Sequence, residues 1–171
     1  MSLLARRRVL GDLGAAGALL LLGGRAHAAT TPGTILLQIV TAKTNAIRDI
    51  TFPDLRQLYR GKRIGLSGLH VIPFNHPPGT FDRVGFDRVL FGMGPDEIGR
   101  FWIDQRIRGG EPPPRTIDSV SLLLRVVAAL EGAIGYVREG FLAPDLKVVT
   151  IDGKLPGDRG YPLAISSHSA V

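Results

Sequence analysis

Residues 70–90 read HVIPFNHPPGTFDRVGFDRVL and place a strand, a turn and a helix start in direct succession. The apolar run at 70–74 predicts a β-strand, and the Pro-Pro-Gly that follows predicts a turn. Thr80 precedes apolar residues at helical spacing, so we expect it to be the N-cap of a helix that runs to about Leu90. A strand that passes directly into a helix indicates an α/β domain.

The rest of the chain continues this alternation of strands and helices. Further strands are predicted at 35–40, 134–137 and 147–151, and further helices at 51–60, 95–107 and 119–130. Phe101 and Trp102 lie in the second of these helices, and we expect them in the hydrophobic core. The pattern predicts an α/β fold whose mostly parallel or mixed sheet is covered by helices on both faces.

Residues 1–28 have the features of an export signal. Three arginines at 6–8 precede an apolar run, and Ala-His-Ala at 26–28 provides the small residues that a signal peptidase accepts. The order Arg-Arg-Arg-Val-Leu at 6–10 resembles the twin-arginine pattern, and an ordinary secretory signal is the alternative. The apolar run is too short to span a bilayer, which needs roughly 20 residues. We therefore expect a signal peptide at 1–28, one domain without a transmembrane segment at 29–171, and a periplasmic location.

The composition argues against several classes of function. Four arginines and one aspartate lie in residues 1–28, so half of the net charge of +6 belongs to the predicted domain. This mild charge and the predicted export argue against a nucleic-acid partner. The chain has no cysteine, and His70 and His76 lack partners at metal-ligand spacing. Because no serine has a nucleophile motif either, we expect no metal, no cofactor and no catalytic residue, and hence a protein that is not an enzyme.

The sharpest candidate site is the turn at 75–80, with Arg83 one helical turn further on. A helix start after a glycine leaves backbone N–H groups unpaired at the positive end of the helix dipole, which favours an anion. Thr80 can donate its hydroxyl, and the Arg83 guanidinium suits phosphate or carboxylate oxygens. The spacing alone favours a simpler interpretation, in which Thr80 only caps its own helix and Arg83 is solvated.

Four further patterns occur in a fixed order along the chain. They are ITFPDLRQLYRGK at 50–62, VIPF followed by Gly-Thr at 71–80, EGAIGYV at 131–137, and a strand and loop at 151–163. Together they resemble the phosphate-binding proteins of bacterial phosphate ABC transporters and a family of short exported proteins like them. EGAIGYV is the most specific, since that family has Pro-Gly-Ala-Ile-Gly-Tyr-Val. The resemblance implies one lobe of a type II periplasmic-binding-protein-like fold, a mixed sheet flanked by helices.

The candidate site departs from the pattern of the large relatives. Their phosphate-gripping segment reads Arg-x-Asp-x-Ser-Gly-Thr, and here Phe74, His76 and Pro78 stand at its Arg, Asp and Ser. Gly79 and Thr80 match the pattern, and Arg83 matches an arginine that the short relatives carry one turn into this helix. The resemblance therefore implies that Gly79, Thr80 and Arg83 bind phosphate or a similar oxyanion, with delivery to an ABC transporter.

Two other functions stay open at this point. The chain is roughly as long as one lobe of a full binding protein, so we expect half of the usual ligand cage to be missing. Such a lobe could instead be an interaction module that has lost its ligand and docks on an inner-membrane transporter or sensor. The other alternative is an exported hydrolase of phosphorylated compounds, which would need a nucleophile or metal cluster that the sequence does not show.

Overall fold

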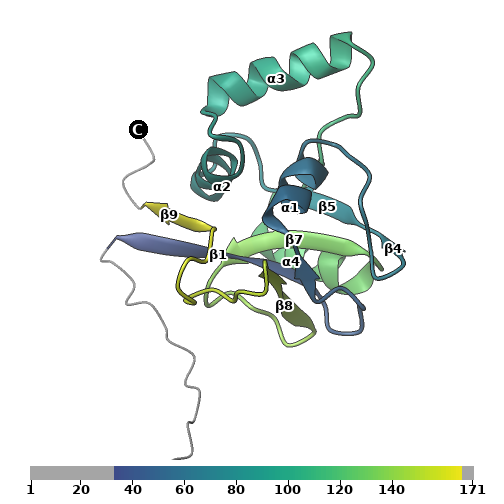
Figure 1. Cartoon of the computed structure of the whole chain (residues 1–171), viewed down its shortest axis with the longest axis vertical. Coiled ribbons are helices and arrows are strands. Elements are labelled where there is room, and N and C mark those ends of the chain that lie inside the picture. The colour runs from purple at the N-terminus through teal and green to yellow at the C-terminus, as the bar shows by residue number, and fades with distance from the viewer. Residues whose placement is uncertain (1–32, 167–171) are drawn as a thin grey trace, which may run out of the picture.

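The computed structural model describes residues 33–166 (Figure 1), so the predicted signal peptide lies outside the described part of the chain. The strands are β1 (Thr34–Ala42), β2 (Asp49–Ile50), β3 (Gly65–Leu66), β4 (Leu69–His70), β5 (Ile72–Asn75), β6 (Arg115–Thr116), β7 (Ala133–Arg138), β8 (Leu146–Ile151) and β9 (Ala164–Ser166). The helices are α1 (Phe52–Tyr59), α2 (Phe81–Phe91), α3 (Pro95–Ile107) and α4 (Val120–Ala129). Within residues 33–166, none of these helices has the length and apolar character to span a membrane.

A seven-stranded mixed sheet organises the domain. Its strand order is β2-β8-β1-β7-β5-β6, and β9 pairs with β1 outside this path. The central strand β1 is antiparallel to β7, β8 and β9, whereas β5 is parallel to both β7 and β6. β3 and β4 form a separate two-stranded hairpin. This arrangement confirms the α/β class and the mixed sheet that the sequence predicts.

The helices cover both faces of the sheet. On one face, α1 and α2 contribute Leu55, Leu58, Phe86 and Leu90 to a core that includes Ile39 and Tyr136. On the other face, α4 packs Leu123 and Val127 against Val40 and Val137. α3 packs on α2 and lies at the outer edge of the molecule (Figure 1).

Local sequence signals set the ends of several helices. Thr51 accepts a hydrogen bond from the Asp54 amide at the start of α1, and Ser119 accepts one from the Leu122 amide at the start of α4. Gly92 ends α2 in the left-handed conformation, with φ of 70°. The four helices therefore lie close to where the sequence places them.

Two expectations about the strands and the core are wrong in detail. The strand predicted at 70–74 is two strands, because Val71 turns aside to donate its amide to the Ile64 carbonyl, while Ile72 donates to Gly132. Phe101 and Trp102 are only half-buried, and the helix that carries them, α3, packs on α2. Neither ring belongs to the two buried clusters of the core.

Two glycines allow helices to approach the sheet closely. A Cβ at Gly85 of α2 would lie 2.8 Å from Cδ1 of Ile165 in β9. A Cβ at Gly135 of β7 would lie 2.8 Å from Cδ2 of Leu123 in α4. Both distances are shorter than a carbon contact allows, so each helix reaches its position because a side chain is absent.

Candidate functional site

Gly79 and Thr80 lie where β5 ends and α2 begins, and both are exposed. Gly79 has φ of +81°, a left-handed conformation that glycine adopts without strain. Thr80 occupies the predicted N-cap position, but its hydroxyl donates to the Pro77 carbonyl oxygen at 2.8 Å and does not cap the helix. The first-turn amides of α2 therefore lack a side-chain acceptor from Thr80.

Arg83 points into the protein, which differs from the solvated side chain of the simpler sequence interpretation. Its side chain is 7% exposed. The guanidinium donates through Nε to Asp87 Oδ2 at 2.6 Å and through Nη1 to the His76 carbonyl oxygen at 3.1 Å. Within residues 33–166 the guanidinium makes these two hydrogen bonds, and Nη2 takes part in neither.

Asp87 is the site residue that the sequence analysis missed. It is buried beside Arg83, and its second oxygen, Oδ1, has no hydrogen-bond partner among the described residues. Burial raises the pKa of the Asp87 carboxyl, and the neighbouring Arg83 opposes that rise. The available signal was the spacing, because residues four apart on a helix face one another and these two have opposite charge.

Two stacked aromatic rings, those of Phe86 and Tyr136, lie next to the turn at 75–80, and we call this pair the aromatic floor. Phe86 of α2 stacks on Tyr136 of β7 with ring centroids 3.8 Å apart. The Tyr136 hydroxyl donates to Asn75 Oδ1 at 2.6 Å, and His76 Nε2 donates to the Tyr136 carbonyl oxygen at 2.8 Å. Burial raises the pKa of the Tyr136 hydroxyl, so it stays protonated as the donor. The tyrosine of EGAIGYV thus holds both residues that begin the turn.

A cavity of about 190 Å³ lies beside Gly79 and Arg83. Its walls come from α2, from α3 and from the segment that leads into β6. The lining residues are Pro78, Gly79, Arg83, Val84, Asp87, Pro95, Ile98, Gly99, Trp102, Pro113, Pro114 and Thr116. Because Asn75 and Thr116 are the last residues of the parallel strands β5 and β6, the cavity lies at the edge of the sheet where α/β proteins commonly bind ligands.

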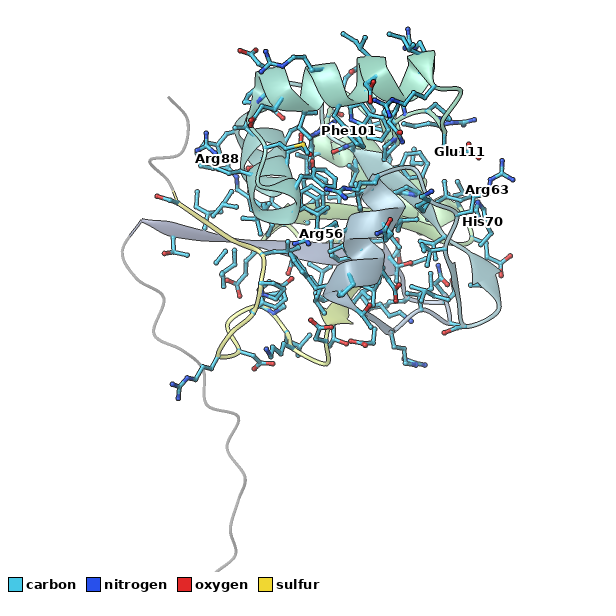
Figure 2. The ribbon with its side chains drawn as sticks, turned by 45° about the horizontal axis from the view of Figure 1, so that its top comes forward. Arg56, Arg63, His70, Arg88, Phe101 and Glu111 are labelled. Atoms are coloured by element: carbon cyan, nitrogen blue, oxygen red, sulfur yellow. The ribbon has the colours of Figure 1, made fainter. Side chains whose placement is uncertain are left out.

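Two other cavities have volumes of about 180 and 350 Å³, and the first shares Pro113 and Pro114 with the lining of the site cavity. Arg63, His70 and Glu111 line the smaller of them and lie close together in Figure 2, and Arg63 Nη2 lies 3.3 Å from Glu111 Oε1. Neither cavity is lined by Gly79, Thr80 or Arg83. Residues 33–166 contain no group of three or more side chains that could hold a metal ion.

Solved structures with similar folds include proteins of phosphate transport. An ABC-type phosphate transport receptor from Vibrio cholerae is 15% identical with a TM-score of 0.62, and the match covers 78% of this chain and 55% of that one. A Clostridium perfringens protein assigned to phosphate ABC transport and solved with bound phosphate is 16% identical, with a TM-score of 0.62 and coverage of 78% and 54%. PstS from Borrelia burgdorferi is 12% identical, with a TM-score of 0.60 and coverage of 78% and 56%.

These similarities define the class of fold. The domain has the fold of periplasmic phosphate-binding proteins, and the chain spans about half the length of the solved structures it matches, which corresponds to a single lobe. The predicted resemblance and fold class are confirmed. No family model and no curated protein matches the sequence.

Proposed function

We propose that the protein is a periplasmic solute-binding protein that holds phosphate or a similar oxyanion at Gly79, Thr80 and Arg83. The observation that supports this best is the cavity beside Gly79 and Arg83, at the carboxyl ends of β5 and β6 in a phosphate-binding-protein fold. The anion would accept from amides at the start of α2 and from Arg83 Nη2. Thr80 would join by rotating its hydroxyl away from Pro77.

The Arg83 and Asp87 pair sets the strength of binding. The carboxylate cancels most of the long-range attraction of the guanidinium, since the two atoms lie 2.6 Å apart. A single lobe also leaves part of the anion in water, so fewer hydrogen bonds replace its hydration. We therefore propose that the protein binds the anion weakly. The role that we propose for the protein is delivery of the anion to an ABC-type phosphate transporter.

Thermal unfolding of the full chain tests the oxyanion site. Phosphate at about 10 mM and a Kd near 1 mM should raise the Tm by about 4 °C, because a ligand that binds only the folded protein stabilises it by mass action. Sodium chloride at matched ionic strength is the control. An unchanged Tm at every phosphate concentration up to about 10 mM would contradict the proposal.

A double variant separates the charge of the site from its fold. R83Q/D87N removes both charges and keeps side chains of similar size, so the domain should fold and lose the phosphate-dependent shift. R88Q, on the exposed side of α2, is the matched control and should keep the shift. If R83Q/D87N keeps the same phosphate-dependent rise in Tm as R88Q, Arg83 does not bind the anion.

We also propose that the protein is not an enzyme. The neighbours reported above are transport receptors and binding proteins, which supports this proposal. A screen of generic phosphoesters, with and without divalent metal, should give no turnover above a blank. Hydrolysis that scales with protein concentration would favour the hydrolase instead.

One observation favours the interaction module as a second candidate. Ile103 and Ile107 lie one turn apart on α3 and are 62% and 78% exposed. Exposed apolar side chains on one helix face are a feature of surfaces that contact another protein. Cross-linking that captures a partner, is lost in I103E/I107E and is unchanged in R83Q/D87N would support docking over oxyanion binding.

A further inference from the structure

Much of the cavity lining is apolar. Its apolar residues include Val84 of α2, Ile98 and Trp102 of α3, and Pro113 and Pro114. Ile98 and Pro114 are buried, and Trp102 is half-buried. The charged pair thus shares the cavity with a lining made mostly of carbon.

Such a lining suits inorganic phosphate poorly. All oxygens of a phosphate ion in solution accept hydrogen bonds from water. Each oxygen that loses this water on binding needs a hydrogen-bond donor from the protein. Proline, valine and isoleucine side chains provide none, and the Trp102 indole provides a single N–H. An oxyanion with an apolar substituent fits better, because its head replaces water with Arg83 and Gly79 while its body gains from leaving water.

We propose that the cavity binds a small organic oxyanion, a phosphonate or phosphate monoester whose compact apolar group packs on Val84, Ile98 and Trp102. This inference rests on the oxyanion site proposed above and names its class of ligand. The volume of about 190 Å³ limits the substituent to roughly the size of one ring, since cavities for drug-sized molecules start at about 300 Å³.

Trp102 gives the site its own reporter. It is the one tryptophan of the chain, and its indole Nε1 is buried without a partner among the described residues. A ring that packs against this indole changes its surroundings and therefore its fluorescence. Binding in the cavity can be followed on the full chain without a label.

The experiment compares three probes by Trp102 fluorescence and by calorimetry. Inorganic phosphate carries the anionic group alone, and uncharged benzamide carries the ring alone. Phenylphosphonate carries both. Phenylphosphonate should bind at least about tenfold more tightly than phosphate, because burying about 60 Å² of its ring corresponds to that factor. It should also bind more tightly than the uncharged benzamide.

A matched pair of variants locates the ring. V84T puts a hydroxyl into the apolar wall without changing its shape and should weaken phenylphosphonate several-fold while leaving phosphate unchanged. V89T makes the same change on the same helix, where Val89 packs against the core outside the cavity lining. It should leave both affinities unchanged.

The outcomes distinguish this inference from the function on which it rests. If phosphate binds and phenylphosphonate binds equally or less tightly, the organic ligand class is overturned and the oxyanion site stands. If benzamide binds as tightly as phenylphosphonate, the anionic head is not recognised and the inference fails. If neither anion binds, both the proposed function and this inference fall.

Discussion

The two helices that border the cavity are held in place very differently. α2 is fixed to the sheet by the Phe86 and Tyr136 stack, by an ion pair between Asp82 and Arg138 at 2.6 Å, and by the close approach of Gly85 to Ile165. α3, which lies wholly within the described residues, buries one residue, Ile98, and packs on α2. The helix that carries Arg83, Asp87 and Val84 is therefore held firmly, whereas the helix that carries Ile98 and Trp102 can shift at lower cost.

This difference explains how one cavity can bind the anionic group of a ligand at a fixed position and still adapt to its apolar substituent. Arg83 and Asp87 sit on the fixed helix, so the position of the charge is set before a ligand arrives. Trp102 sits on the loosely held helix, where small movements can adapt the wall to different substituents. Three sets of substitutions test this contrast.

The largest effect is expected from truncating the aromatic floor. Phe86→Ala removes a fully buried ring from between α2 and β7, so the free energy of unfolding should fall by about 4 kcal/mol. Phe101→Ala on α3 removes a half-buried ring and should cost about 1.5 kcal/mol. Urea unfolding measures both, and equal losses would mean that α3 is as firmly held as α2.

Breaking the buried ion pair should have the next largest effect, and this effect depends on pH. Arg83→Gln leaves the Asp87 carboxylate buried without its partner, which should cost about 3 kcal/mol near pH 7. Burial already raises the pKa of Asp87, and loss of Arg83 raises it further. The folded variant then binds more protons than the unfolded chain, so its stability should recover as the pH falls toward about 5.

The wild-type protein is the reference for this pH dependence. Its guanidinium opposes the rise in the pKa of Asp87, so its stability should change less over the same interval. Urea unfolding at several pH values gives the two profiles. Parallel profiles would show that Asp87 does not titrate differently in the variant, contrary to the expectation.

The smallest effect comes from a pair of glycines, one on each helix. Gly85→Ala should destabilise by about 1.5 kcal/mol, because the new Cβ meets three atoms of Ile165 within 3.2 Å. Gly99→Ala on α3 meets nothing within 4 Å and should stabilise by about 0.7 kcal/mol through helix propensity. Thermal unfolding measures both changes in stability. A loss for Gly85→Ala with a gain for Gly99→Ala would support the contrast between the helices, and changes of the same sign would contradict it.

The sequence predicts the long elements of this domain well and the short strands poorly. β1, β7, β8 and the four helices carry their own apolar periodicity and capping residues, so local patterns suffice. β2, β6 and β9 have two or three residues each, and they exist because backbone that is distant in the sequence pairs with them. β9, for example, is a strand because Ile165 lies opposite Ile35 in β1.

The candidate site divides in the same way. The turn at Gly79 and the helix start at Thr80 follow from local sequence, and the structure places Gly79 in the lining of a cavity. The burial of Arg83 could not be predicted, since it depends on how α2 lies on the sheet. The wall made by Ile98, Trp102 and Pro114 depends on the placement of α3 and was not visible in the sequence. Whether Gly79, Thr80 and Arg83 bind an anion stays a prediction.

The pairing of β9 with β1 brings the two ends of the described domain together. Thr34 lies opposite Ser166 in the register of these strands. A short linker could therefore join these two positions, and a new chain start could be opened in a distant loop without unravelling the sheet. Because its two ends are adjacent, the domain would also be suited to insertion into a surface loop of another protein.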